Sequence, residues 1–162
     1  MFMVSAQAHG IQFENEVHKL LQNTKHDVLL NEKEIRKQEP TITAIDHLLI
    51  ANNICFCFQD KWLKTNISNS NFNHFSKCVE KVAIKLNNSM KIYGVYICNN
   101  DFSSIANKQL EEENNKYKLG QSIIEYIKIN NMVKDIIYDT IQKLLHSNNI
   151  FMYDKDGDCI MI

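Results

Sequence analysis

Two short apolar segments joined by an Asn-Asn turn constrain the fold most. They are TITAIDHLLI, residues 41–50, and ICFCFQDKW, residues 54–62, with Ala51-Asn52-Asn53 between them. Runs of β-branched and aromatic residues bounded by asparagines predict two neighbouring strands, here a hairpin. The second segment is apolar enough for a central strand, yet it continues into Gln59-Asp60-Lys61. Polar side chains at the end of a buried strand need partners or open onto a site.

The rest of the chain alternates between helical and strand patterns. Apolar spacing predicts helices over about residues 5–24, 72–88, 103–113 and 132–146, strands over 91–98 and 122–129, and a hairpin around the Asp-Gly of the tail. Residues 31–40 read as a polar stretch that ends at Pro40, the single proline. This order predicts an α/β fold in which helices flank a mixed central sheet. We expect a single domain over 1–162, with its core at about 5–147 and a C-terminal β-hairpin over 148–162.

Composition narrows the classes of protein. The 162 residues are 44% hydrophobic and 23% charged, with a net charge of −1. This excludes a uniformly basic nucleic-acid coat but leaves room for a local basic groove. Five cysteines without a CxxC pair indicate a reducing compartment. Because no stretch approaches 18 apolar residues, we expect a soluble, intracellular protein without a membrane span.

Side-chain alternation along the second strand defines a candidate site. Gln59 and Lys61 share one strand face, and Asp60 lies on the other. The preceding strand contributes Asp46, an acid among apolar residues. Carboxylate and amide oxygens can hold Mg²⁺, and a lysine ammonium can offset charge on a reacting phosphate. An Asp, an amide and a Lys meeting across a hairpin therefore favour metal-assisted phosphodiester hydrolysis.

These residues resemble the PD-(D/E)xK nuclease superfamily, and are most similar to its Mrr-like restriction endonuclease branch. The resemblance rests on Asp46, on the QxK element Gln59-Asp60-Lys61, and on the helix segment GIQFENEVHKLL with its Phe13-Glu14 pair. It covers most of residues 10–146. It implies the restriction-endonuclease-like fold and a divalent-metal-dependent deoxyribonuclease that uses Mg²⁺ or Mn²⁺.

The resemblance also implies roles for single residues. Asp46 would be the central metal ligand, Glu14 a helix-borne acid that completes the site, Gln59 a ligand through its amide oxygen, and Lys61 the catalytic lysine. Ile45 stands where the family name has proline. Gln59 in place of an acid removes one negative charge, which should weaken metal affinity.

Alternatives remain open for these residues. Asp46 could be a turn acid, Gln59 and Lys61 a strand end in solvent, and Glu14 an ordinary helix position with Glu16 as its rival. His47 adjoins Asp46 but points to the other strand face, so we do not assign it a catalytic role. The sequence contains no GxxxxGK[ST], GxGxxG or GxSxG motif, which disfavours nucleotide hydrolysis, dinucleotide redox and serine-hydrolase chemistry.

A basic stripe is the candidate nucleic-acid surface. It consists of Lys77, Lys81 and Lys85 at helical spacing, with Lys64 near one end. A solvated helix face is the alternative. We therefore expect a DNA endonuclease, and the rival is an inactive nucleic-acid-binding or interaction module that keeps the fold. The C-terminal hairpin could serve as an edge for homodimerisation or be a tail strand of the same sheet.

Overall fold

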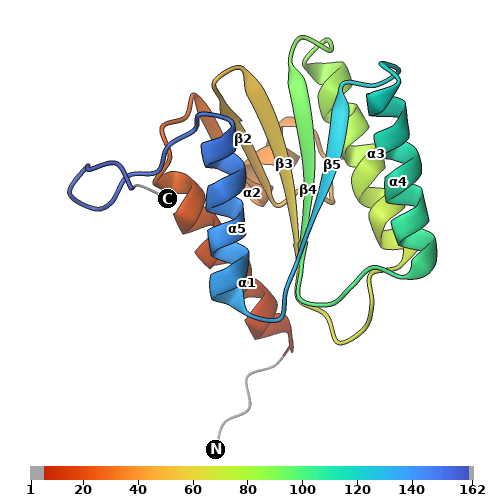
Figure 1. Ribbon diagram of the computed structural model, residues 1–162, viewed down its shortest axis with the longest axis horizontal. Helices are drawn as coiled ribbons and strands as arrows, with labels where there is room; N and C mark the ends of the chain where they lie inside the picture. The colour runs from red at the N-terminus through yellow and green to blue at the C-terminus, as the bar shows by residue number, and fades with distance from the viewer. Residues whose placement is uncertain (1–5, 161–162) are drawn as a thin grey trace, which may run out of the picture.

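A computed structural model describes residues 6–160, in which helices cover both faces of one mixed sheet (Figure 1). The helices are α1 (Ala6–Gln22), α2 (Glu32–Gln38), α3 (Asn69–Lys85), α4 (Ser104–Lys118) and α5 (Lys134–Ser147). The strands are β1 (Val28–Asn31), β2 (His47–Ala51), β3 (Ile54–Lys61), β4 (Lys91–Cys98) and β5 (Ile124–Asn130). The predicted α/β class, a mixed sheet flanked by helices, is confirmed.

The sheet has the spatial order β1-β2-β3-β4-β5. The first three strands are antiparallel, whereas β4 and β5 run parallel to β3. The strands β3, β4 and β5 therefore end at the same edge of the sheet, where β2 begins. This edge gathers the polar residues that follow the apolar part of β3.

The β2–β3 hairpin forms where the sequence predicts it. Asn52 and Asn53 both have positive φ values, 52° and 60°. Two consecutive residues of this conformation make a turn whose twist matches that of the flanking strands, and asparagine tolerates it better than most residues. The antiparallel register pairs His47 with Phe58 and Ala51 with Ile54.

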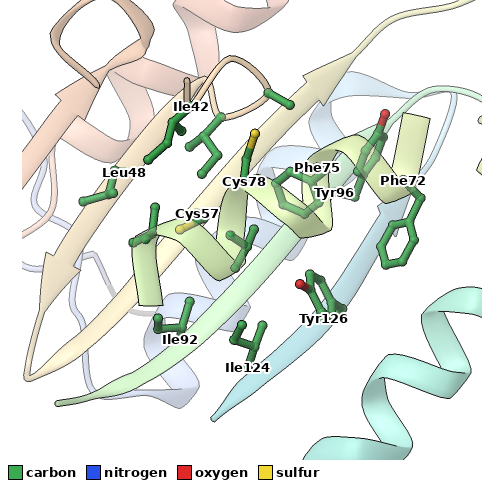
Figure 2. Packing of buried hydrophobic residues seen from close by; sticks show 14 of the residues in the cluster. Ile42, Leu48, Cys57, Phe72, Phe75, Cys78, Ile92, Tyr96, Ile124 and Tyr126 are labelled. Carbon is green, nitrogen blue, oxygen red and sulfur yellow. The ribbon is translucent and has the colours of Figure 1, made fainter. Parts of the chain in front are cut away.

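Alternation along β3 separates two hydrophobic clusters. Cys55 and Cys57 belong to the cluster under α3 and α4, and Phe56 and Phe58 to the cluster under α1 and α5. Figure 2 shows part of the first cluster. The predicted face pattern of β3 is thus present, and Gln59 and Lys61 continue the α3 side. The five cysteines are free, and four of them are buried.

Three parts of the chain differ from the expectation. The strand β1, for which no strand was predicted, forms one edge of the sheet. The polar stretch 31–40 contains α2, which begins with a capping box between Asn31 and Glu34. At the C-terminus the Asp-Gly turn forms, but the hairpin is reduced to an isolated bridge between Tyr153 and Cys159. The polar turn occupies most of this segment, so few residues remain to pair; residues 161–162 lie outside the described part. None of the helices in residues 6–160 is long and apolar enough to cross a membrane.

Candidate metal centre

Asp46 stands at the point where β2 begins beside the end of β3. Its backbone N–H donates to the Phe58 carbonyl at 2.8 Å, and its Oδ2 accepts a hydrogen bond from the Asp60 N–H at 2.7 Å. The side chain is only 6% exposed. Both ends of the residue are therefore tied to β3, so the orientation of the carboxylate is set by the hairpin itself.

Two further carboxylates come from separate helices. Glu14 of α1 and Glu32, the first residue of α2, offer oxygens that lie within 4.8 Å of one another and of an Asp46 oxygen. Neighbouring oxygens around Mg²⁺ are about 3 Å apart and opposite ones about 4.2 Å, so the three carboxylates would move closer together to bind one hard cation. Glu32 also pairs with Arg36 at 2.6 Å, which offsets part of its charge.

Burial and neighbouring negative charges raise the pKa values of Glu14 and Asp46. Burial is the main cause that raises the pKa of Glu14 to about 7, with contributions from Asp60 and Glu32. Burial and the charge of Asp60 likewise raise the pKa of Asp46 well above its ordinary value, although the hydrogen bond from Asp60 acts in the opposite sense. Without a cation, at least part of the cluster is protonated near neutral pH.

Gln59 and Lys61 lie at the end of β3 on the α3 side of the sheet, and among residues 6–160 no hydrogen bond or ion pair joins their side chains to the three carboxylates. The register that pairs His47 with Phe58 places Gln59 beside Asp46. Gln59 is 5% exposed, and its Oε1 makes no hydrogen bond within the described chain. Lys61 is partly exposed and forms no ion pair among residues 6–160. A buried amide oxygen without a partner is costly unless something binds to it.

The opposite face of the same strands carries a polar chain that borders Glu14, which lines one pocket with His18 and His47. His47 Nε2 contacts Asp60 Oδ2, and His18 Nδ1 lies 3.0 Å from His47 Nδ1. Burial opposes protonation of His47, but the adjacent Asp60 carboxylate outweighs it and raises the histidine pKa. Alternation along β3 turns Asp60 away from Gln59 and Lys61, and on the opposite face it pairs with His47.

The competing helix acid is engaged elsewhere. Glu16 accepts a hydrogen bond from the Tyr138 hydroxyl and lies 3.9 Å from Lys134 of α5. Glu14, and not Glu16, is therefore the residue of α1 that lies with Asp46. Between the two glutamates of this helix, the structure favours the one that the resemblance implies.

The lysine stripe on α3 is partly used by local contacts. Lys85 pairs with Glu39 at 3.2 Å, and Lys81 donates to the Thr41 carbonyl at 3.3 Å. Lys77 and Lys64 are exposed and make no ion pair within the described residues. Because α3 packs antiparallel to β3, Lys85 lies at the end of the helix far from Asp46. The stripe thus leads away from the carboxylates, whereas Lys64 follows directly after β3.

Glu32 is the site residue that sequence reasoning missed. It lies in the stretch interpreted as a polar connection, and its approach to Glu14 depends on how α2 and α1, which pack on opposite faces of the sheet, are placed around β1. The signal that was available is the pair Asn31 and Glu34, which forms a capping box. That pair marks the start of a helix and so places Glu32 in its first turn.

Comparison with known proteins shows no family for this chain. No family model matches the chain, and no curated protein matches it. A crystal structure of a protein of unknown function, AF1548, is similar with a TM-score of 0.40 and 14% sequence identity. The match covers 72% of this chain and 56% of that one, so the chain spans about half the length of AF1548.

Proposed function

We propose that the chain is a divalent-metal-dependent endonuclease that hydrolyses DNA phosphodiester bonds. The observation that carries this proposal is the convergence of Glu14, Glu32 and Asp46, with oxygens within 4.8 Å, at the corner where β3 ends in Gln59 and Lys61. The carboxylates come from three elements that are separate in sequence. A solvated acidic surface would not require one of them to be buried beside an amide oxygen that has no partner.

The donor set suits Mg²⁺ or Mn²⁺. It consists of oxygens only, which these hard cations prefer. Glu32 also supplies a negative charge where Gln59 replaces the acid of the (D/E)xK element. The raised pKa values of Glu14 and Asp46 reflect burial and repulsion, and a cation would relieve the repulsion.

Each side chain then has a distinct task. A divalent cation bound here would polarise the scissile phosphate and make a water more acidic. Asp46 and Glu14 would hold that cation through their carboxylates, with Gln59 contributing its amide oxygen. Lys61, on the same strand face as Gln59, would offset the charge that develops on the phosphate in the transition state.

A plasmid-nicking assay tests the proposal. Wild-type protein with Mn²⁺ should nick supercoiled DNA, and EDTA should stop the reaction. Asp46→Asn should abolish nicking, whereas Asp135→Asn, a change of an exposed acid on α5, should not. Nicking that survives Asp46→Asn would come from a contaminant or from another site, and either result would contradict the assignment.

The rival is a non-catalytic nucleic-acid-binding module with the same fold. Gln59 in place of an acid favours it, because a site with less negative charge binds metal more weakly. The rival predicts DNA binding without cleavage under every metal condition. The surface that contacts phosphates would in either case include Lys64 and Lys77, the two candidate lysines whose side chains form neither an ion pair nor a hydrogen bond within residues 6–160.

A further inference from the structure

Tyr96 of β4 shares an unusual property with Gln59 of β3. The two residues are direct partners in the parallel ladder, so their side chains lie on the same face of the sheet. The Tyr96 hydroxyl and the Gln59 Oε1 are both buried, and within residues 6–160 neither atom makes a hydrogen bond. Buried polar atoms rarely lack partners, so two such atoms on paired residues indicate that both take part in one interaction that this structure does not contain.

The surroundings of Tyr96 fix its ring but leave its hydroxyl free. The ring lies edge-on to Phe75 and Phe102, with centroid distances of 5.3 and 5.2 Å. Figure 2 shows the hydroxyl pointing away from Phe75 and Tyr126. The Tyr126 hydroxyl, on the same side of the sheet, donates to the Ser76 carbonyl. The other buried tyrosine hydroxyl of this face is thus satisfied, whereas within the described residues the Tyr96 hydroxyl and the Gln59 Oε1 are not.

The chemistry of an amide ligand suggests what this hydroxyl does. A carboxylate presents oxygen at both ends, but glutamine presents an oxygen and an NH₂ group, and only the oxygen can bind a cation. A site that uses glutamine must therefore select one of two amide orientations. Burial, followed by the charges of Cys98 and Asp46, raises the pKa of Tyr96, so its hydroxyl keeps its proton.

We propose that Tyr96 is a positioning residue for Gln59: its hydroxyl donates a hydrogen bond to the Gln59 amide oxygen and so holds that oxygen, rather than the nitrogen, toward the cation. This inference rests on the proposed metal centre. The oxygen of an amide has two lone pairs, so one can accept from Tyr96 while the other faces the cation. The two atoms form no hydrogen bond in this structure, so the proposal requires the Gln59 side chain to change conformation when a cation binds.

A double-mutant cycle on Mn²⁺ affinity, measured by electron paramagnetic resonance, tests the inference without relying on cleavage. Tyr96→Phe should weaken Mn²⁺ binding about fivefold, the value of one hydrogen bond. In a Gln59→Glu background the same change should alter affinity less than about twofold, because both ends of the carboxylate are oxygen. A general packing effect would weaken binding equally in both backgrounds.

The control is Tyr93→Phe, which changes the opposite face of β4 and should leave Mn²⁺ affinity unchanged. Tyr96→Phe should also unfold in EDTA at the same temperature as wild type or a higher one, since it removes an unpartnered buried hydroxyl. Equal affinities of wild type and Tyr96→Phe, or equal losses in both backgrounds, overturn the role of Tyr96 but leave the metal centre in place. Absence of Mn²⁺ binding by wild type overturns both.

Discussion

The backbone N–H of Asp60 donates a 2.7 Å hydrogen bond to Oδ2 of Asp46. The strand that carries Gln59 and Lys61 therefore also orients the carboxylate of the neighbouring strand. The Asp60 side chain meanwhile pairs with His47 on the other face. Asp60 thus contacts Asp46 through its backbone and His47 through its side chain. Substitutions of Asp60 and of its neighbours should separate the effects of these two contacts on activity and stability.

Lys61→Ala should separate chemistry from binding. The lysine charge is aimed at the transition state, so its removal should lower kcat about 10²- to 10³-fold while DNA affinity in EDTA changes little. Single-turnover cleavage and a DNA-binding titration measure the two quantities. Lys108→Ala, at an exposed position of α4, is the matched control and should change neither.

Asp60→Ala provides the complementary test. It leaves the backbone N–H that binds Asp46, so cleavage chemistry should remain largely intact at a temperature where the variant is folded. It also leaves buried His47 without its carboxylate, which should lower the free energy of unfolding by about 3–5 kcal/mol. Loss of cleavage in folded Asp60→Ala together with full activity of Lys61→Ala would mean that the strand faces are assigned wrongly.

Gln59→Glu should tighten metal binding. It restores the acid of the (D/E)xK element beside Asp46, and one additional ligand charge should raise Mn²⁺ affinity by about tenfold. Isothermal titration calorimetry measures the change. Gln109→Glu, on α4, is the control and should have no effect. Unchanged or weaker Mn²⁺ affinity in Gln59→Glu would show that Gln59 is not a ligand.

Stability without metal should depend on pH through Glu14. Its pKa is raised from 4.5 to about 7, so the folded state retains a proton that the unfolded state has lost. This contribution to stability is fully present below pH 4.5 and is lost as the pH rises through about 7. In EDTA, urea unfolding from pH 5 to 8 should show a steeper decline for wild type than for Glu14→Gln. Parallel curves would argue against a raised pKa.

The three lysines of the stripe on α3, and Lys64 in the segment after β3, should not contribute equally to DNA binding. Among the residues that the structure describes, Lys64 and Lys77 form no ion pair or side-chain hydrogen bond, whereas Lys81 and Lys85 contact Thr41 and Glu39. If each free lysine meets a phosphate, the double Ala variant at 64 and 77 should reduce the salt slope by roughly 0.9 per contact. The double variant at 81 and 85 should reduce it less. Identical slopes for wild type and both variants would leave the lysines as a solvated face.

Local patterns explain why most of the fold could be predicted. Apolar spacing predicted α3, and runs of β-branched and aromatic residues on either side of the turn at Asn52-Asn53 predicted β2 and β3. Each of these signals lies within a few residues. The strand β1 and helix α2 were missed because both are short and α2 is polar apart from Ile35. The order of the sheet depends on contacts between distant segments, which no local pattern contains.

The residues of the candidate site likewise fall into those that a local pattern predicts and those that depend on the packing of distant segments. Asp46, Gln59 and Lys61 lie on one predicted hairpin, so their proximity follows from strand register. Glu14 was proposed through a resemblance, because α1 is far from the hairpin in sequence. Glu32 and Tyr96 depend on how α2 and β4 pack against these elements, and neither could be assigned before the packing was known.

Anomalous diffraction from crystals soaked in Mn²⁺ tests the central claim most directly. We predict a peak within coordination distance of an Asp46 oxygen, with Glu14 and Glu32 turned toward it and the Gln59 Oε1 in reach. Asp46→Asn crystals soaked in the same way should lack the peak. A clean map at this corner at high Mn²⁺ concentration, in wild-type crystals grown above pH 7, would contradict the metal centre and with it the proposed nuclease.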